Sequence, residues 1–217
     1  MSSAPTTTPD TLLADGLREL RLDVPVPVQE RLLHYLDFLA DWNRHTNLTA
    51  VRDPAAMVTR HLLDSLALLP YLHGTKLADL GSGAGLPGIP LALARPDIEV
   101  TLVDSNGKKA RFLAAAVTEL GLSAQVAHSR IEQLGGRYDT VTARALASLA
   151  QMLAWGGRLL APGGVWLAQK GQYPHAELAA LPAGYAARTL PLPVPGLDAQ
   201  RHLVIIHGGG PQQPEQA

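Results

Sequence analysis

The spacing of hydrophobic residues changes near residue 75 of this 217-residue chain. Before that point, apolar side chains recur every three or four positions, which is the spacing that lines one face of an α-helix. The pattern predicts three helices, at 10–20, 28–43 and 54–69. We therefore expect residues 10–74 to form a helical extension that packs on the part that follows.

Beyond residue 75, short apolar runs alternate with helical segments. The runs predict strands at 76–80, 99–103, 124–128, 138–143 and 164–169. Helices are predicted between them, most clearly at 106–120 and 146–153. Such alternation is typical of a mostly parallel sheet with helices on both faces. A short helix at 175–181 and two more strands, near 185–190 and 202–206, then predict a hairpin that adds an antiparallel strand at the sheet edge.

Composition narrows the classes of protein to which the chain can belong. Hydrophobic residues make up 47% of it, enough for a large core, and the absence of cysteine excludes disulfides and cysteine nucleophiles. Neither a secretory signal nor an apolar run of membrane-spanning length is visible, so we expect a cytoplasmic protein with no membrane partner. The two ends, 1–9 and 208–217, are predicted to be disordered tails.

Positive charge is concentrated in one part of the chain. The net charge of the whole chain is −1, but residues 105–171 hold eight Lys or Arg and three Asp or Glu. A local excess of this kind can attract a polyanionic substrate, although ordinary solvated helix surfaces would give the same count. The charge pattern permits a nucleic-acid substrate without requiring one.

A glycine-rich turn joins the first predicted strand to the helix after it. Residues 79–88 read DLGSGAGLPG, and Asp104 ends the next strand. Gly81, Gly83 and Gly85 let the backbone approach a ligand, and an acid at the position of Asp104 accepts hydrogen bonds from ribose hydroxyls. The arrangement indicates an adenosine-containing cofactor. The plainer alternative is a strand-to-helix turn that needs glycine for its backbone.

The details of the turn favour S-adenosylmethionine over a dinucleotide. A dinucleotide fingerprint reads G-x-G-x-x-G, and its third glycine would fall on Leu86. Pro87 removes a backbone donor where a pyrophosphate would bind. Asp79 fits poorly beside a diphosphate but well beside the sulfonium and ammonium groups of S-adenosylmethionine. We therefore predict that Asp79 and the three glycines bind this cofactor.

One further turn points to a particular fold. Residues 161–164 read Ala-Pro-Gly-Gly just before the fifth predicted strand, and they resemble a turn common in class I S-adenosylmethionine-dependent methyltransferases. We therefore expect that α/β fold at 75–207. Its Rossmann-like sheet would have seven strands, mostly parallel with the last strand antiparallel, and the helical extension would precede it.

The residues also narrow the choice of methyl acceptor. Without cysteine, the chain has no thiolate to add to carbon 5 of a pyrimidine. Methylation of exocyclic amines usually goes with an Asn/Asp-Pro-Pro-aromatic sequence after the fourth strand, where this chain reads ARAL at 143–146. A ring nitrogen such as guanine N7 has a lone pair and no proton, so it needs alignment rather than a general base. Arg144 and Lys170, at the carboxyl ends of two predicted strands, are the candidate catalytic residues, and no metal is expected.

Several segments together resemble one bacterial family. They are NLTAVRD at 47–53, RHLLDS at 60–65, GSGAGLPGIP at 81–90, LVDS at 102–105, RFL at 111–113, and the pairs Arg144-Ala145, Lys170-Gly171 and Arg201-His202. On these motifs the chain is similar to the bacterial 16S ribosomal RNA guanine-N7 methyltransferases, also called glucose-inhibited division protein B, over roughly residues 28–206.

The resemblance implies a substrate and a set of cofactor contacts. The substrate would be one guanine of 16S rRNA near the decoding site. Free rRNA, an assembly intermediate and the finished small ribosomal subunit all stay open as its form, and we expect the enzyme to be a monomer. Gly81 and Leu86 would contact S-adenosylmethionine through their backbone. Ile131 and Glu132 would frame its adenine.

Four basic residues are assigned by the same resemblance. Arg144 would line the junction between cofactor and substrate. Arg130, Lys170 and Arg201 would engage the RNA or the target base. For Arg130, a structural salt bridge with Glu132 or Asp139 is an equal alternative.

Other interpretations stay open at this point. His61 and Asp64, three apart on one helix, could close over the cofactor pocket or make a polar contact with the core. Trp42 and Trp166 are expected to pack in the core rather than stack on bases, and Trp155 is left open. A methyltransferase of small molecules and a non-catalytic RNA-binding module on the same fold are the alternative functions.

Overall fold

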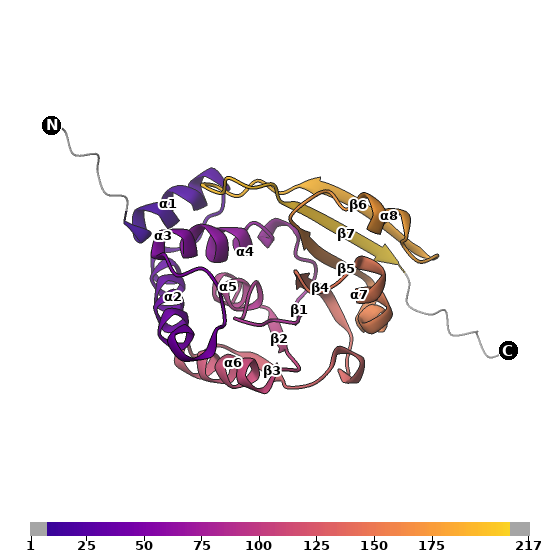
Figure 1. Cartoon of the computed structure of the whole chain (residues 1–217), viewed down its shortest axis with the longest axis horizontal. Helices are drawn as coiled ribbons and strands as arrows, with labels where there is room; N and C mark the ends of the chain where they lie inside the picture. Colours follow the sequence, from indigo (N-terminus) through magenta and orange to yellow (C-terminus); the bar gives the residue numbers. More distant parts are fainter. Residues whose placement is uncertain (1–7, 209–217) are drawn as a thin grey trace.

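A seven-stranded sheet forms the centre of the molecule, for which a computed structural model describes residues 8–208 (Figure 1). The strand order is β3-β2-β1-β4-β5-β7-β6. The strands are β1 (Lys76–Leu80), β2 (Glu99–Val103), β3 (Ala124–Ala127), β4 (Tyr138–Arg144), β5 (Leu160–Lys170), β6 (Tyr185–Pro191) and β7 (His202–Gly208). All seven predicted strands are present, and the predicted fold class is confirmed.

The reversed strand lies inside the sheet and not at its edge, where we expected it. β7 is antiparallel to both neighbours, as predicted, but it lies between β5 and β6, and β6 forms the edge. The apolar run 203–206 explains this position, because its four residues are buried while most of β6 is exposed or half-buried. β6 also ends in Pro191, which suits an edge strand because proline donates no ladder hydrogen bond.

Helices cover the two faces of the sheet unequally. The longer elements are α1 (Pro9–Glu19), α2 (Val26–Thr46), α5 (Gly88–Ala94), α6 (Gly107–Glu119), α7 (Leu149–Gly156) and α8 (His175–Ala179). Helices α1, α2, α5 and α6 share one hydrophobic core with the sheet, and α7 lies in a second core on the other face. Neighbouring residues of β5 divide between the two cores, Leu167 in the first and Trp166 in the second, because side chains alternate along a strand.

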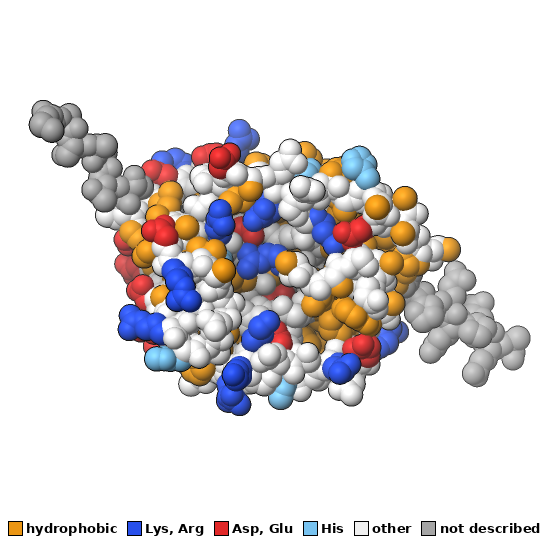
Figure 2. All heavy atoms as spheres, viewed as in Figure 1, with side chains coloured by type: hydrophobic (Ala, Val, Ile, Leu, Met, Phe, Trp, Pro, Cys, Tyr) orange, Lys and Arg blue, Asp and Glu red, His pale blue; other side chains and the backbone are white. Residues whose placement is uncertain are grey.

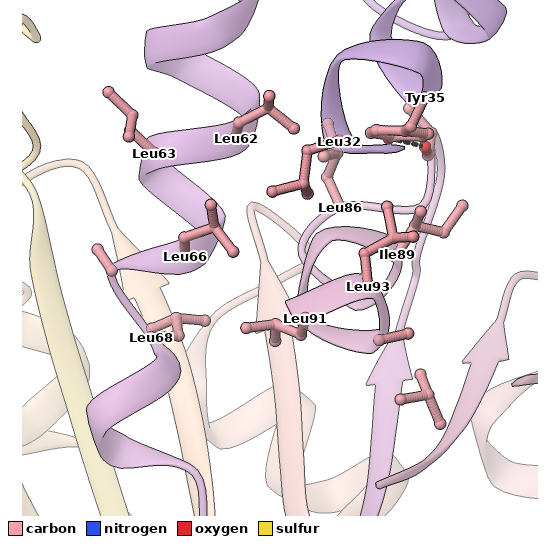
Figure 3. Close-up of a cluster of buried hydrophobic side chains, with 14 of the residues drawn as sticks. Leu32, Tyr35, Leu62, Leu63, Leu66, Leu68, Leu86, Ile89, Leu91 and Leu93 are labelled. Carbon is pink, nitrogen blue, oxygen red and sulfur yellow. Dashed lines mark hydrogen bonds between the residues drawn. The ribbon is translucent and has the colours of Figure 1, made fainter. Parts of the chain in front are cut away.

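The N-terminal helices are part of the first core. Figure 3 shows Leu62 and Leu66 on the side of their helix that faces α5. The Tyr35 hydroxyl of α2 also donates a hydrogen bond of 2.6 Å to the carbonyl of Ala84, inside the glycine-rich turn. Burial raises the pKa of Tyr35, which keeps the hydroxyl a donor. Trp42 packs against Phe112 with ring centroids 5.6 Å apart, so its predicted core role is confirmed.

The third predicted helix contains a widened turn. It consists of α3 (Pro54–Met57), a π-helical turn η1 (Val58–Leu63) and α4 (Asp64–Leu66), and a 3₁₀ turn η2 (Leu69–Tyr71) follows. The Asp53 carboxylate caps its start by accepting from the backbone N–H of Ala56 at 2.8 Å. A π turn adds one residue to a helical turn and is often found at functional sites. Here it directly precedes Asp64.

The predicted Pro-Gly-Gly turn is an irregularity at the start of β5. Pairing with β4 shifts between Tyr138↔Leu160 and Thr140↔Val165, so residues 161–164 bulge from the ladder. A Cβ on Gly164 would lie 2.9 Å from the carbonyl oxygen of Asp139, too close for any other residue. The remaining short elements are the 3₁₀ turns η3 (Ile131–Gln133) and η4 (Gly157–Leu159).

The ends of the chain lie mostly beyond the described residues. Of the predicted tails, 1–7 and 209–217 are outside them, while Pro9 begins α1 and Gly208 ends β7. Within residues 8–208, no helix has both the length and the apolar character to cross a membrane.

Candidate functional site

Two cavities open where the parallel strands end. The first cavity has a volume of about 370 Å³. It is lined by Gly81, Val103, Asp104, Ser105, Asn106, Lys109, Ser129, Ile131, Arg144, Ala145 and Leu146. The second cavity, of about 400 Å³, is lined by Asp64, Arg144, Ala145, Gln169, Lys170, Gly171 and Arg201. Arg144 and Ala145 belong to both walls. Figure 2 shows Lys and Arg side chains gathered around the hollow in the middle of this face.

The glycine-rich turn is held in its shape by Asp104. Gly81, Gly83 and Gly85 all have positive φ, at 70°, 59° and 84°, a conformation that residues with a Cβ rarely adopt. The backbone N–H of Gly83 donates to Asp104 Oδ2 at 2.9 Å, and that of Asn106 donates to Oδ1 at 2.8 Å. Asp104 thus fixes the turn against the end of β2. Each oxygen keeps a further lone pair toward the cavity.

Asp79 serves the turn rather than the cavity wall. Its side chain is fully buried, and Oδ2 accepts from the backbone N–H of Gly88, at the start of α5, at 3.0 Å. Oδ1 has no hydrogen-bond partner among the described residues. Burial raises the pKa of Asp79 to about 6, against which the Gly88 N–H acts. Asp79 lies outside the lining of the first cavity, and its predicted contact with the cofactor stays a prediction.

The other predicted cofactor residues divide into two groups. Gly81, Asp104, Ile131 and Arg144 line the first cavity. Gly83, Gly85 and Leu86 do not: the Cβ position of Gly83 is 3.9 Å from Nζ of the lining residue Lys109, Gly85 is packed against Ile89, and Leu86 is only 4% exposed in the core. Glu132 is exposed and outside the lining, and its backbone carbonyl accepts from Arg158 at 2.6 Å.

Several lining residues were missed by the sequence analysis. They are Ser105, Asn106, Lys109, Ser129 and Leu146. All lie within six residues of the end of β2, β3 or β4, so their signal was position alone: open α/β sheets bind ligands at the carboxyl ends of strands. Asn106 also caps α6, its side chain accepting from the backbone N–H of Lys108 at 3.0 Å.

The first cavity fits S-adenosylmethionine in its donor set. Asp104 offers free lone pairs to ribose hydroxyls, and Ile131 offers an apolar wall to an adenine. A Cβ built on Gly83 would be in ordinary contact with the carbonyl oxygen of Gly81 at 3.7 Å and with Lys109 Nζ at 3.9 Å, so no atom there is too close for a side chain. Residues 8–208 contain no group of three or more His, Cys, Asp or Glu side chains placed to hold a metal ion.

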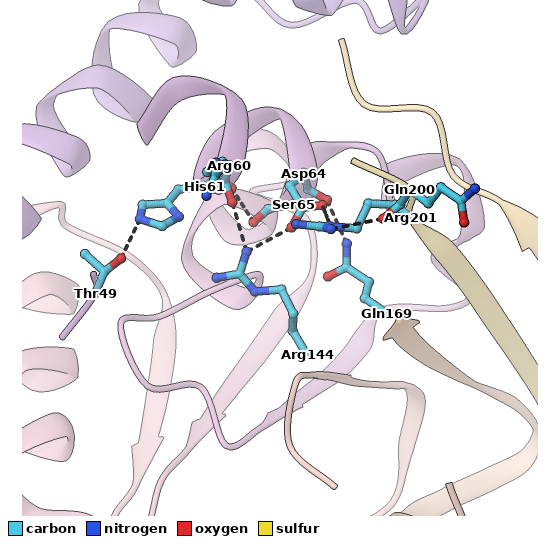
Figure 4. Close-up of polar contacts among 9 residues, drawn as sticks. All are labelled: Thr49, Arg60, His61, Asp64, Ser65, Arg144, Gln169, Gln200 and Arg201. Atoms are coloured by element: carbon cyan, nitrogen blue, oxygen red, sulfur yellow. Dashed lines mark hydrogen bonds and ion pairs between the residues drawn. The ribbon is translucent and has the colours of Figure 1, made fainter. Parts of the chain in front are cut away.

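A buried carboxylate organises the second cavity. Asp64 is 1% exposed and forms two ion pairs, its Oδ2 with Arg144 Nη1 at 2.9 Å and its Oδ1 with Arg201 Nε at 3.0 Å (Figure 4). The carbonyl of Arg60 also accepts from Arg144 Nη1 at 3.0 Å. Gln169 Nε2 donates to the backbone carbonyl of Asp64 at 2.8 Å. The structure thus brings two of the predicted basic residues together through an acid to which the sequence assigned no such role.

Lys170 is held in the same wall. Its Nζ donates to the carbonyl of Ala147 at 2.9 Å and to Glu177 Oε2 of α8 at 2.8 Å. Glu177 Oε2 also accepts from the backbone N–H of Leu149 at 2.7 Å, in the first turn of α7. Lys170 thus lines the second cavity together with Arg144 and Arg201, and Glu177 is its ion-pair partner.

Arg130 stands apart from the other three. It is exposed, lines neither cavity and makes no ion pair within residues 8–208. The alternative pairing with Asp139 is not formed, because that carboxylate accepts from the backbone N–H groups of Thr75 and Lys76. The RNA contact predicted for Arg130 stays a prediction.

His61 borders the site without entering it. It is 4% exposed, and its Nε2 lies 3.0 Å from Thr49 Oγ1. Burial lowers the pKa of His61 to about 4, so the ring is neutral at physiological pH. Of the two possibilities left open from the sequence, both residues make polar contacts: His61 with Thr49, and the buried Asp64 with Arg144 and Arg201.

The strand order, the reversed β7 and the glycine turn at the end of β1 define a class I methyltransferase. Solved structures share this fold. The N-methyltransferase NodS from Bradyrhizobium japonicum WM9, in complex with S-adenosyl-L-homocysteine, has a TM-score of 0.54 at 16% identity, covering 80% of this chain and 99% of that one. TrmN from Thermus thermophilus has a TM-score of 0.53 at 20% identity, covering 77% and 53%.

The sequence comparisons identify the family. The chain belongs to the rRNA small subunit methyltransferase G family (GidB), whose family model matches residues 28–204. Ribosomal RNA small subunit methyltransferase G of Xanthomonas campestris pv. campestris strain 8004 is 57% identical over 199 residues, covering 90% of this chain and 93% of the relative. The Stenotrophomonas maltophilia K279a protein of the same name is 57% identical over 200 residues, with the same coverage. The predicted resemblance, the class of enzyme and S-adenosylmethionine as methyl donor are confirmed.

Proposed function

We propose that this enzyme transfers the methyl group of S-adenosylmethionine to N7 of one guanine in 16S rRNA of the small ribosomal subunit. The observation that carries the proposal is the shared wall: Arg144 lines both the first and the second cavity. A cofactor in the first cavity and a base in the second would therefore meet at this side chain. The family and its named relatives supply the class of RNA.

The second cavity suits a nucleophile that carries no proton. The bound cofactor supplies an electrophilic methyl carbon on its sulfonium. Among the described lining residues, the one carboxylate, Asp64, is occupied by Arg144 and Arg201, so no side chain is set to remove a proton. Guanine N7 needs none, and its methylation depends on alignment and the exclusion of water.

The three cations of the second cavity would hold the RNA. Arg144 and Arg201 present N–H donors that Asp64 orients, and such donors suit guanine O6 or a phosphate oxygen. Lys170, at the end of β5 next to the strand that carries Arg144, provides a point charge. We infer that the substrate is the small subunit or its assembly intermediate, met by a monomeric enzyme in the cytoplasm, where ribosomal subunits are made.

Transfer of labelled methyl groups tests the proposal. Incubation with labelled S-adenosylmethionine and unmethylated small subunits should label one nucleotide, and mapping should place the label on a guanine whose N7 is modified. Turnover should fall steeply as salt is raised, because RNA binding releases counterions. Label in a pyrimidine, or only in protein, would contradict the proposal, as would turnover of a small metabolite that is indifferent to salt.

A further inference from the structure

Three aromatic rings lie together beside the second cavity. Tyr173 packs on His175 with ring centroids 4.3 Å apart and an interplanar angle of 42°. It also meets His202 edge-on, at 5.6 Å and 85°. Tyr173 and His175 are exposed and His202 is half-buried. We call this group the aromatic shelf, and none of its members contributes to either cavity lining.

The position of the aromatic shelf is fixed by two strands that form the cavity wall. His202 is the register partner of Lys170 in the β5–β7 pair, and it directly follows Arg201. Tyr173 comes two residues after Gly171, which lines the second cavity. The shelf therefore borders the two cations that would hold the RNA.

The exposure of Tyr173 sets it apart from the other aromatic residues. It is 44% exposed, and among the described residues Val26 is the other large hydrophobic side chain that is so exposed. Its partners fix the orientation of the ring without covering it, so little conformational freedom remains to be lost on binding. A rigid, half-open ring beside fixed positive charge suits a planar ligand that carries negative charge at its edge.

We propose that the aromatic shelf stacks an RNA base next to the methylated guanine. The inference rests on the proposed function, because it takes the second cavity as the seat of the target base. A single-stranded loop offers unstacked bases, and aromatic side chains are their usual partners. The phosphate that joins the stacked nucleotide to the target would lie toward Lys170 and Arg201. The charge of the wall thereby favours a nucleotide over an apolar peptide as the occupant.

Kinetics of three variants at one position separate stacking from packing. Tyr173→Leu keeps an apolar side chain but has no aromatic face, and it should raise KM for unmethylated small subunits about 10-fold, which is within the range for loss of one stacked base. Tyr173→Phe and Tyr173→Trp should stay within about 2-fold of the wild type, since both can stack. In all three, kcat at saturating subunits and the affinity for S-adenosylmethionine should be unchanged. Val26→Ala, at the start of α2, is the matched control for an exposed apolar side chain.

A binding measurement identifies the occupant. Tyr173→Leu should weaken binding of protein-free 16S rRNA by a similar factor, while the unfolding temperature stays that of the wild type. If the loss appears with small subunits but not with protein-free rRNA, the shelf contacts a ribosomal protein and the proposal is wrong. It is equally wrong if Tyr173→Leu has a wild-type KM, or if Tyr173→Phe and Tyr173→Trp lose as much as Tyr173→Leu. Failure of the wild type to methylate guanine would instead contradict the proposed function.

Discussion

The two cavities that meet at Arg144 are built in different ways. The first is formed by short segments at the ends of four neighbouring strands, β1 to β4, and its central turn is held by backbone N–H groups on Asp104. The second is assembled by side-chain charges from distant parts of the chain. Asp64 pairs with Arg144 across 80 positions and with Arg201 across 137.

The difference predicts how each cavity fails. A backbone-held cavity is sensitive to added bulk and to changes in φ, and it tolerates changes of charge at its rim. A cavity held by buried ion pairs keeps its shape only while its charges match, because an unpaired buried charge is costly. Substitutions of the two kinds should therefore separate cofactor binding from RNA methylation.

The largest effect is expected from Asp64→Ala. It would leave Arg144 and Arg201 close together without the carboxylate between them, and removal of one partner of a buried pair costs about 3–5 kcal/mol. Denaturant unfolding should show a loss of that order, and labelled methyl transfer should fall about 100-fold or more at the same temperature.

An exposed pair provides the control. Asp97→Ala removes an ion pair with Arg95 at 2.6 Å in which both side chains are well exposed. It should leave both the free energy of unfolding and methylation nearly unchanged, because exposed ion pairs contribute little. Equal destabilisation by the two variants would show that Asp64 is not the organising charge of the second cavity.

The second prediction concerns the first cavity. Gly83→Val adds a side chain at a positive φ of 59°, and its Cβ would point toward Lys109, which lines the cavity. Calorimetry should show affinity for S-adenosylmethionine reduced about 100-fold, because the branched side chain enters space that the ligand needs.

Gly121→Val is the control for Gly83→Val, because it introduces a similar backbone strain. Gly121 has a φ of 55° and nothing within 4 Å of its Cβ position, but it lies at the far end of α6. Both variants should lose about 1 kcal/mol of stability, since both place a branched residue in the left-handed region. If Gly121→Val loses cofactor affinity as well, strain rather than blocked space explains the result.

The contrast between the cavities also explains what the sequence could predict. The turn at 81–85 and Asp104 were found because strand, glycines and acid occur in order within about 25 residues. For Asp79 the same local logic predicted a cofactor ligand, but it could not show that the side chain is buried, because the burial depends on how α5 closes over it. Local patterns give the elements, and packing decides which side chains reach the cavity.

The role of Asp64 could not be derived from spacing. A helix over 54–69 was expected, but the π turn at Val58–Leu63 rotates the residues that follow it. Its two partners lie on β4 and just before β7, and the position of β7 inside the sheet was itself not foreseen. Asp64 belongs to the family motif RHLLDS, but the motif does not show with which residues its carboxylate pairs.

A third prediction tests the positive wall of the second cavity. Lys170→Ala should reduce methylation of small subunits about 10-fold with cofactor affinity unchanged, because Lys170 lines the second cavity and not the first. Lys76→Ala, at the opposite end of the sheet in a 4.0 Å pair with Glu99, should change neither. Parallel loss of cofactor binding in Lys170→Ala would mean that the cavities are not separate in function.

The smallest effect should appear in the pH dependence of stability. Two buried groups, Asp79 near the first cavity and His61 near the second, should change the free energy of unfolding with pH in opposite directions. Burial raises the pKa of Asp79 from 3.8 to about 6. Between these two pH values, the folded protein therefore keeps a proton on Asp79 that the unfolded chain has lost. Its contribution to stability is full below about pH 4 and is lost as pH rises through 6. Burial lowers the pKa of His61 from 6.5 to about 4, so its contribution is full above pH 6.5 and is lost as pH falls through 4.

Variants that cannot titrate should therefore tilt the stability profile in opposite directions. Between pH 4 and 6.5, Asp79→Asn should make the free energy of unfolding rise more steeply with pH than in the wild type, by up to ~1.4 kcal/mol per pH unit. His61→Gln should make it rise less steeply or fall. Denaturant unfolding at four or five pH values measures both slopes. If both variants tilt the profile the same way, one of the two groups is solvated rather than buried, and the cavity beside it is more open than the structure indicates.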